Sequence, residues 1–435
     1  MRMNCVRWNR PHSGWRPGRA LRRSRRLAFA LPAACLVAAA AGAAGGTPKS
    51  AAYATRPLSC APPGVKQPPC YSPRAYQVAY GVAPLLRRGI DGRGETVVVP
   101  ELASSPPSMD IRKDLATFDS TFGLPPAKLR IVNMFARSKT PYLADDEEVE
   151  DTEMVHAIAP GATLAVVLLP EDSNADSAKF FTTAATELVR AGIELHAAVI
   201  SISASAGEHF FTRAEAAQMH AAMGSARDHR LTVVVSSGDL GAISDGGPPK
   251  QVSLPASDPL ALAVGGTILD AAQPGGNYLG EMAWNGGSDG SAGGFSSLFA
   301  RPSYQDGVTR DSKRGVPDVA ANADTATAMA VEYSDHELRA ATGTSASAPL
   351  WAGVIALADQ AAHRHLGFVN PTIYAIARRH HHAFHDVVTG DNSVMWSTGI
   401  VVGYNARPGW DPVTGWGSPD AQRLVSLLAH PASGP

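Results

Sequence analysis

The sequence predicts an α/β fold in which a twisted, mainly parallel sheet lies between layers of helices. One observation is a series of short strand candidates that are apolar almost throughout, at residues 95–100, 129–135, 163–169, 197–203, 231–237, 260–264 and 328–332. Strands that are apolar on both faces are typical of a parallel sheet covered by helices on each side. A second observation is that amphipathic stretches, such as 175–191 and 213–229, alternate with the strands and can form the crossovers.

Composition and charge exclude several classes of protein. Hydrophobic residues make up 45% of the chain and charged residues 18%, as in ordinary globular proteins. The net charge is −1, but residues 1–54 hold nine arginines and Lys49 and no acidic residue. Removing these ten positive charges from the total leaves −11 for the rest of the chain. This acidic remainder argues against nucleic acid or an anionic membrane surface as a partner.

Residues 1–54 have the pattern of an export signal. The run of basic residues that ends at Arg26 leads into an alanine-rich apolar stretch, 27–44, which small residues close. A membrane anchor is the alternative, but Pro32 interrupts the stretch and residues 42–46 are rich in glycine. We therefore expect cleavage near residue 43 or residue 54 and a secreted or extracytoplasmic protein without stable membrane insertion.

The remaining chain divides into a short lead-in and one domain. Residues 55–72 are rich in proline and hold Cys60 and Cys70, the two cysteines left after removal of the signal. A disulfide between them is the simplest interpretation in an oxidising compartment. The alternation of strands and helices then continues without an internal repeat, which predicts a single domain over residues 73–435.

The segment 342–353, TGTSASAPLWAG, is the most informative part of the sequence. It leads into a helix that is apolar on every face and is therefore expected to be buried. Ser345 should lie where a loop joins the start of this helix, with Pro349 in the first turn, so that backbone N–H groups point to whatever Ser345 attacks. An isolated serine here would more simply cap the helix. The complete pattern, G-T-S-x-[SA]-x-P before a buried helix, resembles the serine motif of the subtilisin and sedolisin families.

An acidic helix stands where a subtilisin would carry its histidine base. The chain has no His-Gly-Thr or His-Gly-Ser, and upstream of the sequence APGA at 159–162 lies DDEEVEDTEMVHAI. Sedolisins, the serine-carboxyl peptidases, place a Glu and an Asp four residues apart at this point. The resemblance implies that Glu147 is the base and Asp151 its partner, on one helical face. A solvated acidic face is the alternative, the base could instead be Glu148, and Glu150 stands where relatives usually carry an apolar residue.

A third motif follows an apolar strand, in LTVVVSSGDLGA at 231–242. Asp239 occupies the place where subtilisins have an asparagine that donates to the oxyanion. Sedolisins have an aspartic acid there, which can donate a hydrogen bond only when it is protonated. The local sequence alone would also suit a turn. The order Glu147/Asp151, Asp239, Ser345 matches the order of the sedolisin family.

The resemblance covers nearly the whole chain after the signal and implies a subtilisin-like three-layer fold with a C-terminal calcium loop. Oxygen donors from carboxylates and the main chain are what calcium requires. One structural calcium ion would be held by two aspartates and three backbone carbonyls, from Asp386, Val387, Arg407, Gly409 and Asp411.

These observations together predict a secreted, monomeric, calcium-binding serine-carboxyl endopeptidase that hydrolyses proteins or peptides at acid pH. A tripeptidyl exopeptidase of the same family is the first alternative, because the sequence does not reveal whether one end of the cleft is blocked. An inactive homologue that only binds is a second. A metal-binding protein built on the histidines at 380–382 and His385 is a third, although consecutive histidines do not converge on one ion.

Overall fold

The centre of the fold is an eight-stranded sheet in the order β12-β8-β6-β4-β1-β3-β2, with β9 added beside β8. A computed structural model describes residues 58–60, 70–103, 110–133, 146–170, 177–245, 247–333 and 335–430. Every pair in the sheet is parallel except β8 with β9. The strands are Thr96–Ala103 (β1), Lys128–Asn133 (β2), Thr163–Pro170 (β3), Val199–Ile202 (β4), Thr232–Ser236 (β6), Leu262–Ala272 (β8), Asn277–Ala283 (β9) and Val319–Asn322 (β12).

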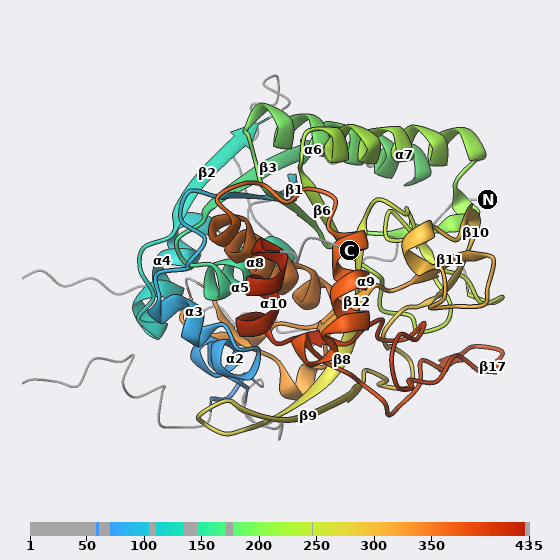
Figure 1. The fold of residues 1–435 in the computed structure, drawn as a ribbon. Helices are drawn as coiled ribbons and strands as arrows, with labels where there is room; N and C mark the ends of the chain where they lie inside the picture. Colours follow the sequence, from blue (N-terminus) through green and yellow to red (C-terminus); the bar gives the residue numbers. More distant parts are fainter. Residues whose placement is uncertain are drawn as a thin grey trace, which may run out of the picture. The chain divides into compact units, whose positions relative to one another are not determined.

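The helices are distributed over both faces of the sheet, with α6 and α7 on one face and α5, α8 and α10 on the other (Figure 1). Their bounds are Pro73–Ala79 (α2), Ala83–Arg87 (α3), Ile111–Phe122 (α4), Asp146–Ile158 (α5), Ser177–Glu194 (α6), Arg213–Asp228 (α7), Gly343–Ala362 (α8), Asn370–Arg379 (α9) and Ala421–Ala429 (α10). The chain thus has the three layers that the sequence predicts.

Apolar side chains fill the space on both sides of the sheet. Along β1, Val97 and Val99 join the core beneath α5 and α8, whereas Val98 joins the core beneath α6 and α7. In β6, Val234 likewise joins the core beneath α5 and α8, and Val235 joins the core beneath α6 and α7. Because successive side chains of a strand point to opposite faces, an entirely apolar strand is buried on both sides. This is the physical reason that these strands could be recognised in the sequence.

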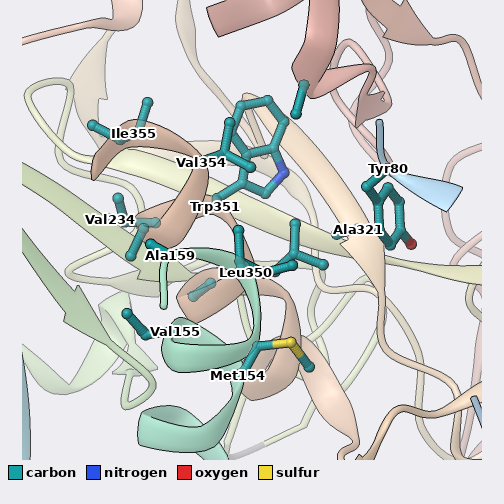
Figure 2. Close-up of a cluster of buried hydrophobic side chains, with 14 of the residues drawn as sticks. Tyr80, Met154, Val155, Ala159, Val234, Ala321, Leu350, Trp351, Val354 and Ile355 are labelled. Carbon is teal, nitrogen blue, oxygen red and sulfur yellow. The ribbon is translucent and has the colours of Figure 1, made fainter. Parts of the chain in front are cut away.

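Helix α8 runs through the interior beside the sheet, and almost every residue up to Asp359 is buried. Figure 2 shows Leu350 and Trp351 of this helix in the same apolar cluster as Met154 and Val155 of α5. Large apolar residues on all faces of α8 remove it from water, so its position is fixed by packing against neighbours on several sides. A rigid helix of this kind can hold a reactive residue at its first turn.

Short two-stranded sheets and 3₁₀ turns connect the main elements. The strand pairs are Ala206–Gly207 (β5) with Ser253–Leu254 (β7), Gly294–Ala300 (β10) with Lys313–Val316 (β11), Ala330–Glu332 (β13) with Leu338–Ala340 (β14), Phe384–His385 (β15) with Ser418–Pro419 (β18), and Val394–Trp396 (β16) with Gly399–Val401 (β17). The 3₁₀ turns are Glu208–Phe210, Ser303–Gln305, Thr325–Thr327 and His381–Ala383.

The α/β fold is confirmed, with one strand placed differently from the prediction. Residues 328–332 were expected in the main sheet, but β13 pairs only with β14 in a separate antiparallel sheet. The edge position of the main sheet is taken by β12, Val319–Asn322, which is parallel to β8. This strand has only four residues, three of them alanine or asparagine, so it lacks the long β-branched run that identifies the other strands.

The predicted domain limits are only partly within the described residues. The export signal, both cleavage positions and most of the lead-in lie outside them, and residues 49–435 fall in one compact unit. Cys60 and Cys70 are joined by a disulfide, with their Cα atoms 6.0 Å apart. Within the described ranges, no helix is both long enough and apolar enough to cross a membrane.

Candidate active site

Helix α8 carries the predicted nucleophile, Ser345, in its first turn. Thr342, the residue before the helix, is extended, and the chain changes direction at Gly343, which has a φ of 78°. This left-handed backbone suits glycine, and a β-carbon at Gly343 would lie 2.6 Å from Asp239 Oδ2. Ser345 is partly exposed. The turn therefore brings the start of α8 against Asp239, and a larger residue does not fit at Gly343.

The sequence predicts Pro349 in the first turn of the helix. In the structure Pro349 lies inside α8, because the helix already begins at Gly343. Proline has no N–H, so the carbonyl of Ser345, four residues earlier, receives no donor from the helix. The hydroxyl of Ser203, just after β4, donates to this carbonyl oxygen at 3.3 Å. The same hydroxyl donates to Asp151 Oδ1 at 2.9 Å. Ser203 thus shares one proton between the nucleophile's helix and the acidic helix.

Helix α5 carries the predicted acid pair. Glu147 and Asp151 are one turn apart, and Glu150 shares their face because residues separated by three or four positions are neighbours on a helix. Asp151 is 2% exposed, and Glu147 is partly exposed. Glu148 is 3% exposed and its neighbour one turn on is Thr152, which is fully buried. Glu147 as the base, in preference to Glu148, stays our prediction.

Asp239 lies on the turn after β6 and is bound to the start of α8. Its Oδ1 accepts hydrogen bonds from Thr344 N at 2.8 Å and Thr344 Oγ1 at 2.7 Å. Thr344 Oγ1 in turn accepts from the amide of Gly238 at 3.0 Å. Burial raises the pKa of Asp239, the bonds from Thr344 oppose this, and the carboxylates of Asp289 and Asp245 add to the rise. The net direction favours the neutral acid.

Glu150 adds a fourth carboxyl group to this region. Its Oε1 accepts a hydrogen bond from the backbone amide of Thr342 at 2.8 Å. Burial raises the pKa of Glu150 well above its usual range, and the nearby carboxylates of Glu147, Asp151 and Asp239 raise it further. The amide of Thr342 opposes the rise. Ionisation of Glu147, Asp151 or Asp239 therefore disfavours ionisation of Glu150, and the titrations of these groups are linked.

The structure brings the predicted residues together at the start of α8. Asp239 is bonded to the residue before Ser345, and Asp151 is connected to Ser345 through Ser203. A helix N-terminus beside a serine and two carboxyls with raised pKa values, Asp239 and Glu150, can hold a negative charge and exchange protons. Ser203 and Thr344 were not predicted from the sequence. The signals for them were slight, a serine at the end of an apolar strand and a threonine directly before the nucleophile.

The predicted calcium ligands lie around one loop. Gly409 N donates to Asp386 Oδ2 at 2.9 Å, and Arg407 N donates to Asp411 Oδ2 at 3.0 Å. Asp411 is fully buried, and its Oδ1 accepts from Thr414 N at 2.9 Å. Two carboxylates therefore reach the same loop, and carboxylate and main-chain oxygens are the ligands that a hard cation requires.

Histidines do not form a metal centre in the described part of the chain. No group of three or more His, Cys, Asp or Glu side chains that could hold a metal ion is found there. His385 stacks on Tyr278 with ring centroids 3.7 Å apart, whereas His381 and His382 contact each other at 5.8 Å. The histidines at 380–382 and His385 are thus engaged in separate aromatic contacts.

Comparisons with known proteins agree on one family. The model of the subtilase family matches residues 143–388. Kumamolisin of Bacillus sp. (strain MN-32) is 34% identical over 382 residues, which are 84% of this chain and 65% of that protein. Tripeptidyl-peptidase sed4 of Aspergillus fumigatus is 34% identical over 242 residues, 46% of this chain and 38% of that protein. The chain thus spans less than two thirds of the length of either relative.

A solved structure shares the fold. Pseudomonas sedolisin, a serine-carboxyl proteinase complexed with two molecules of pseudo-iodotyrostatin, superposes with a TM-score of 0.70 and 25% identity, over 84% of this chain and 99% of that one. With the parallel sheet and the serine at the start of a buried helix, these matches define a subtilisin-like protein. The chain belongs to the subtilase family, as one of its sedolisin-like members. The resemblance seen in the sequence is therefore confirmed.

Proposed function

We propose that this chain is a serine-carboxyl peptidase that hydrolyses peptide bonds of proteins in acid solution. The observation that carries the proposal is the hydrogen bonding around Ser345, in which Thr344 binds Asp239 and Ser203 joins Asp151 to the carbonyl of Ser345. Carboxyl groups stand where a histidine base would be needed in a subtilisin. The similarity to kumamolisin and to a serine-carboxyl proteinase supports the same chemistry.

The first step is attack of Ser345 Oγ on the scissile carbonyl. Glu147 takes the hydroxyl proton as the Oγ–C bond forms, and returns it to the leaving amine as the C–N bond breaks. Water then attacks the acyl carbon while Glu147 takes a proton from it, the C–Oγ bond breaks to release the carboxyl product, and Glu147 returns the proton to Ser345 Oγ. Asp151 orients Glu147 and shares protons with it. Ser203 holds the carboxyl of Asp151 in a fixed position relative to the first turn of α8, because its hydroxyl donates to both.

The oxyanion of the tetrahedral intermediate is stabilised by Asp239 and the backbone N–H of Ser345. Asp239 Oδ1 is engaged with Thr344, so its donor is the Oδ2 hydroxyl, on the side of Gly343. Only the protonated acid can donate in this way. The raised pKa of Asp239 supports this role, because burial keeps the proton in place at a pH where an ordinary aspartic acid would lose it.

Endopeptidase action is our first choice and tripeptidyl exopeptidase action the second, favoured by the similarity to tripeptidyl-peptidase sed4. The deciding experiment uses casein and a set of peptides with free or acetylated N-termini, incubated with wild type and Ser345→Ala. An endopeptidase cleaves casein and both peptide forms, whereas a tripeptidyl-peptidase requires the free amine. A protein without any Ser345-dependent cleavage of either substrate would be the inactive binding homologue.

We propose one structural calcium ion in the C-terminal loop. Asp386 and Asp411 would supply carboxylate oxygens, and the other donors would be main-chain carbonyls of Val387, Arg407 and Gly409. What supports this is that both carboxylates already bind amides of residues 407–409. Calcium would supply charge compensation for these two groups and tie the loop together. Elemental analysis of the purified protein tests its presence.

We also propose that the protein is exported from the cytoplasm. Residues 1–54 would direct secretion, with cleavage near residue 43 or residue 54, and the mature protein would act outside the cytoplasm as a monomer. The Cys60–Cys70 disulfide supports an oxidising compartment. N-terminal sequencing of the secreted protein decides between the two cleavage positions.

A further inference from the structure

The three backbone amides before Ser345 each donate to a different part of the fold. For residues 342–344 in order, the acceptors are Glu150 Oε1 on α5 at 2.8 Å, the carbonyl oxygen of Ala323 after β12 at 2.7 Å, and Asp239 Oδ1 after β6 at 2.8 Å. The start of α8 is thus held from three directions. Two of the three acceptors are carboxyl side chains, and only one of these, Asp239, has a place in the proposed chemistry.

The amide of Thr342 needs an acceptor from outside the helix. N–H groups at a helix start have no partner within the helix, and the side chain of Thr342 makes no capping bond. An amide that loses contact with water and finds no other partner is unfavourable, and Glu150 supplies a partner for this partly buried amide by accepting its hydrogen bond. Because Thr342 is followed by the left-handed turn at Gly343, fixing its amide also fixes the direction in which α8 begins.

We propose that Glu150 is a positioning residue of the peptidase site, which holds Ser345 in line with the acid pair by binding the amide of Thr342. This inference rests on the proposed function. Glu150 connects the helix that bears Glu147 and Asp151 directly to the turn that bears the nucleophile. A displacement of that turn would misplace the hydroxyl relative to its base, and such misplacement is costly for catalysis.

The raised pKa of Glu150 is consistent with a site that acts in acid solution. Its carboxyl faces Glu147 and Asp151 on its own helix and Asp239 on the β6 turn, which in turn faces Asp289 and Asp245. With the pKa of Glu150 raised, the folded protein binds its proton more tightly than the unfolded chain does. The contribution of Glu150 to the free energy of unfolding is therefore fully present at low pH. It is lost as the pH rises from the usual glutamate pKa through the raised one. The neutral carboxyl still accepts from the amide through its carbonyl oxygen.

Two substitutions at Glu150 separate the hydrogen bond from the charge. Glu150→Gln keeps an oxygen acceptor and stays neutral at every pH, so we expect its kcat at about pH 4 to lie within about twofold of wild type. Glu150→Leu removes the acceptor at similar size, and we expect kcat to fall about tenfold or more with KM little changed. The melting temperature of Glu150→Gln should exceed that of wild type by an amount that grows between acid and neutral pH.

Glu153 provides a matched control on the same helix. It is fully buried, its Oε2 accepts the amide of Glu332 at 2.8 Å, and burial raises its pKa well above the usual range. Like the bond of Glu150, this is a hydrogen bond from a backbone amide to a glutamate side chain. It holds β13, however, and not the turn that precedes Ser345. Glu153→Leu should lower the melting temperature, as Glu150→Leu does, yet leave kcat per folded molecule unchanged.

The proposal is overturned if Glu150→Leu keeps the wild-type kcat, or if Glu150→Gln loses as much kcat as Glu150→Leu. Amide hydrogen exchange in a Ser345→Ala background provides a second test that needs no activity. Glu150→Leu should raise exchange in peptides that cover residues 340–347, and Glu153→Leu only in those that cover 329–333. Unchanged exchange at 340–347 would also overturn the proposal. Absence of Ser345-dependent hydrolysis in wild type would instead contradict the proposed function.

Discussion

The two halves of α5 contain similar acidic side chains but bind different parts of the molecule. In the first half, Glu150 accepts an amide of the nucleophile's turn and Asp151 accepts the hydroxyl of Ser203. In the second half, Glu153 accepts an amide of β13, and His156 lies 2.8 Å from Asp119 of α4. The acidic side chains of the first half therefore bind groups of the candidate site, and Glu153 in the second half binds the scaffold.

This comparison indicates that an acidic residue with a raised pKa is not by itself evidence of a functional site. Burial raises the pKa of both Glu150 and Glu153 well above the usual range. What distinguishes them is the residue that each one binds. Substitutions in the first half should therefore change catalysis, and those in the second half should change stability alone.

The largest effect is expected at the nucleophile and the base. Ser345→Ala and Glu147→Ala should each lower kcat/KM by a factor on the order of 10⁴ with little change in melting temperature, because these two groups act as a unit. For the same reason, the double variant should be no worse than either single one. Full activity of Glu147→Ala combined with loss of activity in Glu148→Ala would place the base one residue further along α5.

The next largest effect is expected at the oxyanion donor. Asp239→Ala should lower kcat by about 10²–10³, the usual consequence of losing one donor to the oxyanion. Asp239→Asn keeps both the acceptor for Thr344 and a donor on the other atom, so it should retain part of the turnover and lose part of the decline at higher pH. Equal kcat/KM for Asp239→Ala and wild type would remove this residue from the mechanism.

The calcium loop should affect stability without direct effect on the chemistry, as the second half of α5 does. An ion that binds only the folded state contributes about 2.7 kcal/mol at 100 times its Kd. Asp411→Ala or excess chelator should therefore lower the melting temperature, and added calcium should restore wild type but not the variant. The idea fails if chelator leaves wild type unchanged and no metal is found by elemental analysis.

A smaller effect on catalysis is expected at Ser203. Ser203→Ala leaves the carbonyl of Ser345 and the carboxyl of Asp151 without their shared donor, and should lower kcat about tenfold. Ser201, on β4 two residues before Ser203, is the matched control, since its buried hydroxyl has no hydrogen-bond partner in the described structure. Ser201→Ala should leave kcat unchanged. Similar kcat values for the two variants would remove Ser203 from the site.

The sequence predicts the fold and the order of the site motifs because both depend on local patterns. Apolar strands between amphipathic helices mark the sheet, and the spacing of Glu147 and Asp151 places them on one helical face. The short strand β12 escaped notice because its small residues resemble a loop. The first turn of α8 was placed too late because Pro349 is typical of a helix start, whereas here Ser203 satisfies the carbonyl that the proline leaves free.

The contacts that join the site could not be predicted, because they connect residues far apart in the chain. Glu150 and Thr342 are separated by 192 positions, and Ser203 and Ser345 by 142. No local pattern specifies such a pair, since each depends on how the helices pack against the sheet. The acidic crowding around Glu150 is visible in the sequence, but its binding to the nucleophile's turn is visible only in the fold.

The central claim, a serine nucleophile served by carboxyl groups, is tested most directly by the pH dependence of kcat/KM for wild type on one peptide, from about pH 3 to pH 8. Burial raises the pKa of Asp239, so its donor is present in acid and is lost as the pH rises through that raised value. We predict activity that is highest in acid and falls towards neutral pH, with none in Ser345→Ala. An optimum above about pH 7 would contradict the serine-carboxyl mechanism.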